Sequence, residues 1–166
     1  QYLVTLFEAA DPERTKGDKL TVREVLDAGT KNVNTQFANL PDTLAEMQAV
    51  LGKTYASMSQ PQTALPLLKA ASLAAETKHG SKSIAHARAL YAQAQAESDT
   101  ELFADAARHY TQLLEILGPI EPPASEIMVQ ATINFTHALQ KQGKFLEAEK
   151  LLTSLRPAVI AAHGDK

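Results

Sequence analysis

The chain has 166 residues, of which 28 are Ala and 21 are Leu, against 7 Gly and 8 Pro. Ala and Leu are strong helix formers, so the composition predicts an all-α fold, and the length suits one domain. The absence of Cys excludes disulfides and thiolate metal sites. With 16 basic and 19 acidic residues the net charge is −3, which argues against a nucleic-acid partner. Every apolar run is far shorter than the roughly 20 residues of a membrane span, so direct membrane insertion of this chain is not expected.

The first 41 residues are predicted to form two helices joined by a polar loop. Residues 1–10 carry spaced apolar side chains, and residues 11–19 include Pro12 and Gly17. Thr21 and Glu24 stand three residues apart, which is the spacing of a capping box, and a helix is predicted to follow as far as Phe37. We expect residues 1–41 to be an N-terminal cap region that covers the apolar face of the next segment.

From residue 42 onward the sequence repeats with a period of 42 residues. Ala64, Ala106 and Ala148 mark the register. Three residues before them stand Pro61, Phe103 and Phe145. Four residues after them stand Leu68, Tyr110 and Leu152. The period predicts three structural repeats, at about 45–86, 87–128 and 129–166, because self-similarity at a fixed spacing is typical of solenoids.

Each repeat is predicted to contain two helices, because its apolar residues recur at steps of three and four. The first helices are expected at about 44–55, 84–98 and 125–142. The second helices are expected to begin near Pro61, Phe103 and Phe145. Breaks are expected at Ser59-Gln60, at Asp99-Thr100 and at Gly143, and the middle repeat should end early, at Gly118-Pro119. Short turns predict that the two helices of each pair are antiparallel.

These residues resemble a tetratricopeptide repeat (TPR) array, and the long period resembles the kinesin-light-chain-like variety. The resemblance rests on the small residue at Gly52 or Ala94, the alanine at 64, 106 and 148, and the large apolar residue after it. It implies a right-handed superhelix of antiparallel helix pairs that binds a protein or peptide. The sequence departs from the pattern at Pro61, which replaces an aromatic residue, and at Glu97, which takes a place that is usually apolar.

The resemblance also implies that the first helix of each repeat lines a concave groove. Carried over position by position, it places Ser98 and Asp99 among the groove residues of the second repeat, and from the whole set we select the candidate partner-binding residues Lys53, Arg88, Tyr91, Gln95, Gln130, His137 and Lys141. These side chains offer several hydrogen-bond donors and one aromatic ring to a peptide ligand. A chaperone-type carboxylate clamp is not expected, because Ala49, Ala92 and Asn134 stand where such a clamp needs other polar or basic groups.

A narrower resemblance concerns residues 6–29, from Leu6-Phe7-Glu8 to Asp27-Ala28-Gly29. This stretch is similar to the segment before the repeats in bacterial transmembrane serine/threonine kinases, where it leads into an extracytoplasmic domain. The similarity implies that this chain is the non-catalytic sensor or interaction region of an inner-membrane kinase. Because the chain begins at Gln1 without a leader, we expect it to be part of a longer protein. The alternatives are a cytoplasmic scaffold or regulator domain, a small-molecule sensor, and a dimerisation module that forms a homodimer.

No catalytic motif is present in the sequence. It has no Gly-rich phosphate loop, no H-R-D, no D-F-G and no H-E-x-x-H, and its five His are dispersed. We therefore expect this chain to have no enzyme activity, no catalytic residues, no metal site and no cofactor.

Overall fold

The computed structural model describes residues 21–163, and this part of the chain contains seven α-helices and no strand. The helices are α2 (Val22–Gln36), α3 (Pro41–Ser57), α4 (Pro61–His79), α5 (Ile84–Asp99), α6 (Phe103–Leu117), α7 (Glu126–Lys141) and α8 (Phe145–His163). The helix expected at residues 1–10, the loop after it and most of the kinase-like stretch lie outside the described residues.

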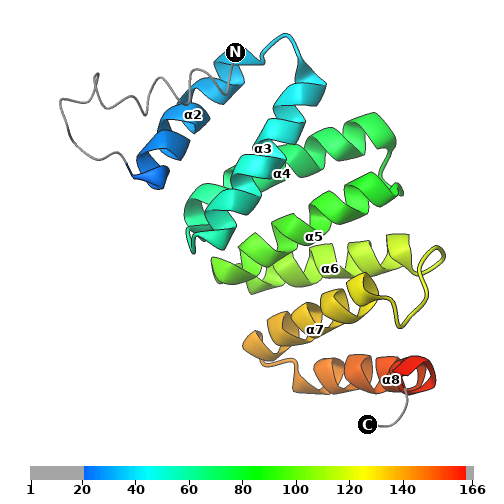
Figure 1. Cartoon of the computed structure of the whole chain (residues 1–166). Coiled ribbons are helices and arrows are strands. Elements are labelled where there is room, and N and C mark those ends of the chain that lie inside the picture. Colours follow the sequence, from blue (N-terminus) through cyan, green and yellow to red (C-terminus); the bar gives the residue numbers. More distant parts are fainter. Residues whose placement is uncertain (1–20, 164–166) are drawn as a thin grey trace.

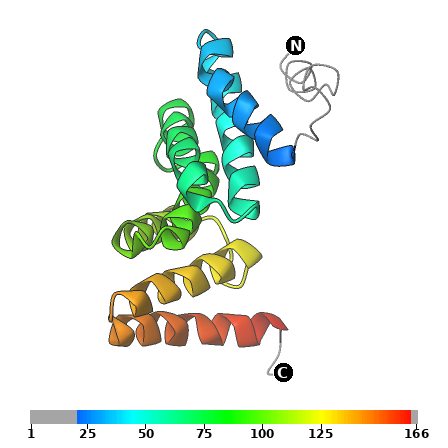
Figure 2. The same cartoon turned by 90° about the vertical axis from the view of Figure 1, so that its left-hand side faces the viewer.

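The helices stack in chain order as a curved array of antiparallel pairs (Figures 1 and 2). Each helix packs mainly against its neighbours in sequence, and weaker contacts join α3 to α5 and α5 to α7. The fold is the predicted all-α, right-handed superhelix of helix pairs, with α3/α4, α5/α6 and α7/α8 as the pairs. The first helices of the three pairs therefore lie on one face of the array, which we call the first-helix face.

The 42-residue period is visible in the turns within the pairs. The first helices end at Ser57, Asp99 and Lys141, and the second helices begin at Pro61, Phe103 and Phe145. Each turn has one residue with positive φ, at Ser59 (57°), Glu101 (63°) and Gly143 (76°). The next backbone N–H donates to the carbonyl five residues earlier, as in Leu102 N to Glu97 O at 2.8 Å. This hydrogen bond closes the helix end in the manner of a Schellman motif.

The predicted turns and helix ends are close to those observed. The middle second helix ends at Leu117, before Gly118, whereas α4 extends to His79, so the early end is confirmed. The break of the second pair lies slightly later than predicted, because Asp99 is the last residue of α5 and the turn comprises residues 100–102. The helix expected as far as Phe37 ends one residue earlier, at Gln36.

Helix α2 begins with the predicted capping box and packs against α3. Thr21 Oγ1 accepts from Glu24 N at 3.3 Å, and Thr21 N donates to Glu24 Oε2 at 2.8 Å. The hydrogen bond from the Thr21 backbone lowers the pKa of the Glu24 carboxyl, because it favours the charged form. Across the contact, the buried Tyr55 of α3 donates its hydroxyl hydrogen to Asp27 Oδ1 at 2.7 Å.

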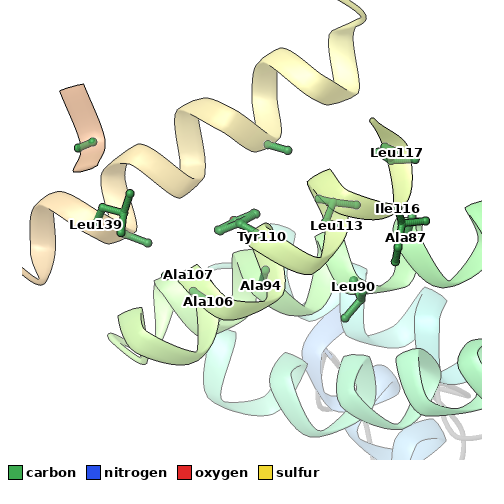
Figure 3. Packing of buried hydrophobic residues seen from close by; sticks show 13 residues of the cluster. Ala87, Leu90, Ala94, Ala106, Ala107, Tyr110, Leu113, Ile116, Leu117 and Leu139 are labelled. Carbon is green, nitrogen blue, oxygen red and sulfur yellow. The ribbon is translucent and has the colours of Figure 1, made fainter. Parts of the chain in front are cut away.

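The core is formed by small and large apolar residues at repeating positions. Ala64, Ala106 and Ala148 are all buried, as their place in the repeat requires. In the second half of the array, Tyr110, Leu113 and other side chains of α6 fill the space toward α5 and α7 (Figure 3). The interior is therefore a row of contacts between neighbouring helices, as in other solenoids.

Glu97 is a buried carboxylate in this core, with 0 % of its surface exposed. Its Oε2 lies 2.6 Å from His109 Nδ1, and its Oε1 accepts from Gln93 Nε2 at 2.9 Å. Lys69 Nζ lies 3.7 Å from Oε1. These partners explain how an acidic residue can take a position that Tyr55 and Leu139 fill in the other two repeats, since a buried charge needs partners.

Candidate functional site: the first-helix face

A cavity of about 410 Å³ lies on the first-helix face, and we call it the central cavity. It is lined by Lys53, Ala56, Leu68, Ala92, Gln95, Ser98, Asp99, Tyr110, Asn134 and His137. These residues come from α3, α5 and α7, with one residue each from α4 and α6 behind them. The central cavity is thus built from all three helix pairs, and residues 84 positions apart in sequence share it.

The wall of the central cavity contains two buried hydroxyl groups without a hydrogen-bond partner. Tyr110 Oη and Ser98 Oγ make no hydrogen bond to any described residue. Tyr110 is fully buried, and burial raises the pKa of its hydroxyl well above the usual value. The polar side chains of Ser98 and Asn134, which lie close to this hydroxyl, partly oppose the rise of its pKa. Buried polar groups are normally paired, but surrounding protein atoms cover both oxygens, so in this structure neither is open to a ligand in the cavity.

Tyr91 supports this wall from α5. Its ring meets the Tyr110 ring edge-on, with centroids 6.3 Å apart, and its hydroxyl accepts from Asn134 Nδ2 at 3.2 Å. Burial raises the pKa of Tyr91, and the hydrogen bond from Asn134 partly offsets the rise. Because Asn134 uses its amide N–H toward Tyr91, its carbonyl oxygen is left to accept a hydrogen bond. The Tyr91–Asn134 contact joins α5 to α7 and fixes one side of the central cavity.

A second, larger space of about 680 Å³ lies between α3, α4 and α5, and we call it the apolar cleft. Alanine is the commonest residue of its lining, at positions 45, 49, 70, 71, 74, 75, 85, 89 and 92, and Leu68 and Leu73 add to the apolar surface. Charged side chains also line it, among them Lys53, Arg88, Glu46 and the Asp42–Lys78 ion pair (2.7 Å). The apolar cleft and the central cavity share Lys53, Leu68 and Ala92, so the two spaces are adjacent.

The seven predicted site residues do not line one common groove. Lys53, Gln95 and His137 line the central cavity, and Arg88 lines the apolar cleft together with Lys53. Tyr91 lines neither space and supports the wall from behind. Gln130 lines a separate cavity of about 310 Å³ beside Val159 of α8. Lys141 is exposed at the end of α7 and lines none of these three cavities.

Sequence reasoning missed two polar residues of the central cavity, Tyr110 and Asn134, whereas Ser98 and Asp99 stand at predicted groove positions and do line it. Tyr110 follows the apolar pattern of α6 and is indeed buried, so nothing in the pattern shows that its side chain also lines the cavity. Asn134 could have been found, because it stands 42 residues after Ala92 and 84 after Val50. A position that is apolar in two repeats and polar in the third indicates that the polar side chain has a specific role in that repeat.

The described residues provide no group of three or more His, Cys, Asp or Glu side chains that could hold a metal ion. Among the helices of this part of the chain, none combines the length and the apolar character that a membrane span requires.

Comparison with solved structures identifies the architecture. A Podosopora anserina protein with nearly identical TPR-like repeats of the kinesin light chain kind superposes with a TM-score of 0.73 at 18% sequence identity. The match covers 97% of this chain and 75% of that one. BtubC (BKLC) from P. vanneervenii gives a TM-score of 0.70 at 15% identity and covers 99% of this chain and 73% of that chain.

The fold is a TPR-like repeat solenoid. The predicted kinesin-light-chain-like arrangement of long helix pairs is thereby confirmed at the level of fold. Neither a protein family model nor a curated protein sequence matches the chain.

Proposed function

We propose that this chain is a protein-interaction domain that binds a peptide segment of a partner along the first-helix face. The central cavity carries the proposal, because three helix pairs contribute to it and each of them lines it with at least one polar or charged side chain. A volume of about 410 Å³ lies within the range of about 300–1,000 Å³ that is typical of ligand sites. TPR-like repeats in general present such a surface to proteins, which agrees with this assignment.

The polar groups around the central cavity suit a peptide rather than a single ion. Lys53 supplies a cation and Asp99 a carboxylate, while Gln95 can both donate and accept. A peptide segment offers N–H and C=O groups along its length and can therefore satisfy donors and acceptors at once. Such contacts are made together by residues of α3, α5 and α7, so the ligand has to lie across the helices.

Peptides selected from a displayed random library of about a dozen residues provide the test. We expect selected peptides to lose about 1–4 kcal/mol of binding free energy on Gln95→Ala or His137→Ala, since interface energy concentrates in a few residues. Lys150→Ala, on an exposed part of α8, is the matched control and should change nothing. Peptides whose affinity is unaffected by every substitution in the central cavity would contradict the proposal.

The kinase-like similarity of residues 6–29 supports a finer proposal. We infer that the chain is the non-catalytic, extracytoplasmic part of a bacterial membrane serine/threonine kinase, and that residues 1–41 form the cap region of its repeat array. The gene sequence upstream of Gln1 tests this inference. A kinase domain followed by an apolar stretch of roughly 20 residues is expected. An upstream sequence without either would contradict it.

A further inference from the structure

We propose that the apolar cleft between α3, α4 and α5 is a specificity site that receives bulky apolar side chains of the bound peptide. The cleft has a volume of about 680 Å³, which is larger than the central cavity beside it. The inference rests on the proposed peptide-binding function and adds the chemical class of the side chains that are recognised. It is based on a comparison of two equivalent intervals of this protein, which are one repeat apart in the sequence.

The next interval between helix pairs, formed by α5, α6 and α7, is built from the same repeat positions. Four alanines that line the cleft have larger counterparts 42 residues later. These pairs are Ala49 and Tyr91, Ala71 and Leu113, Ala74 and Ile116, and Ala75 and Leu117. Ala85 and Leu68 correspond likewise to Ile127 and Tyr110. At each of these positions the first interval has the smaller side chain.

The large side chains of the second interval are buried. Leu113 and Leu117 are fully buried and Ile116 is 8% exposed, while Tyr91 and Ile127 pack against the same cluster. The view in Figure 3 shows Leu113 and Tyr110 on α6 in this cluster, with α7 beyond them. In the second interval, therefore, the chain fills the space with its own leucine, isoleucine and tyrosine side chains. In the first interval the alanines leave that space open, and apolar groups of the same kind fit it.

The cleft suits a chain-like ligand because of what surrounds it. Lys53, Leu68 and Ala92 line both the cleft and the central cavity, so polar groups of the central cavity lie next to the cleft. A peptide that places apolar side chains in the cleft can thus extend its polar groups toward Gln95 and His137. Burial of a leucine or phenylalanine side chain contributes to the binding affinity, and hydrogen bonds in the central cavity fix the orientation of the peptide.

Filling the cleft with the protein's own residues tests the proposal. Ala49→Tyr and Ala74→Ile introduce the side chains that stand at the corresponding positions of the second interval. Ala104→Tyr, at an exposed position of α6 outside the cleft and the central cavity, is the matched control. The probes are peptides selected from the random displayed library on the unmodified protein, and their affinities are measured by fluorescence anisotropy. Circular dichroism verifies that each variant remains helical, and each single variant is measured in case the double variant does not fold.

We expect the selected peptides to be enriched in Leu, Ile, Phe, Tyr or Met at two neighbouring positions of the peptide sequence. We also expect at least about a tenfold loss of affinity on filling the cleft, against less than about twofold for Ala104→Tyr. Peptides that depend on His137 but tolerate the filled cleft would overturn this proposal and leave the peptide-binding function standing. Peptides that bind equally well after the cleft is filled and after His137→Ala would overturn both this proposal and the peptide-binding function.

Discussion

Substitutions at the positive-φ residue of each turn test whether the three repeats share one backbone geometry. Ser59 and Glu101 have φ values of 57° and 63°, where Gly143 stands in the third repeat with 76°. An L-residue in this left-handed region costs roughly 1–2 kcal/mol, while glycine gives back roughly 0.4–1 kcal/mol through the entropy of the unfolded chain. Ser59→Gly and Glu101→Gly should each raise the free energy of unfolding by about 0.5–1 kcal/mol, and Gly143→Ala should lower it by a similar amount.

The assay is thermal unfolding followed by circular dichroism, in which about 1 kcal/mol moves Tm by roughly 2–4 °C in a domain of this size. Gln60→Gly is the matched control, because Gln60 has φ −119° and gains nothing from glycine. It should leave Tm unchanged or lower it. If Glu101→Gly lowered Tm and Gly143→Ala raised it, the shared turn geometry would be refuted.

Three further predictions concern buried groups and use the same unfolding assay. His109→Leu should cost about 3–5 kcal/mol, because it removes the closest partner of the buried Glu97 carboxylate, and the double variant with Glu97→Leu should recover much of the loss. Gly52→Ala should destabilise the protein despite its gain in helix propensity, because the new Cβ would lie 2.7 Å from Leu68 Cγ; unchanged stability would show that Leu68 can move away. Tyr110→Phe should be neutral or stabilising by about 1 kcal/mol at pH 7, because Oη is buried and unpaired. Since burial raises the pKa of Tyr110, folding stability should fall above about pH 10 as the unfolded chain ionises first, and Tyr110→Phe should reduce that fall.

The sequence predicted the fold well because the repeat carries its information locally. Pro61, Phe103 and Phe145 each begin a helix, and Ala64, Ala106 and Ala148 are buried where two helices meet. Period, helix propensity and turn residues all depend on neighbours within one repeat, so they can be identified in the sequence alone.

The candidate site was harder to predict, because it depends on distances between repeats. Tyr110 stands at a core position of the repeat, and the sequence does not show that its side chain also lines the central cavity. The apolar cleft depends on the difference between Ala49 and Tyr91 at one repeat position, and on how α3, α4 and α5 pack around the space. Residue type indicates which side chains are small, but only the packed helices show that the space beside them stays open. The sequence therefore predicts that Arg88 and Tyr91 share one groove. In the structure Arg88 lines the apolar cleft, whereas Tyr91 packs behind the wall of the central cavity.

Alanine-methyl NMR on the intact chain tests the central claim most directly, since alanines stand on every face of the array. A library-selected peptide is titrated into protein labelled at the alanine methyl groups. We predict shifts at Ala49, Ala56 and Ala92, which line the apolar cleft and the central cavity, and no shift at Ala104, an exposed residue of α6. Shifts at Ala104 with none at Ala56 and Ala92 would place the ligand elsewhere and contradict binding along the first-helix face.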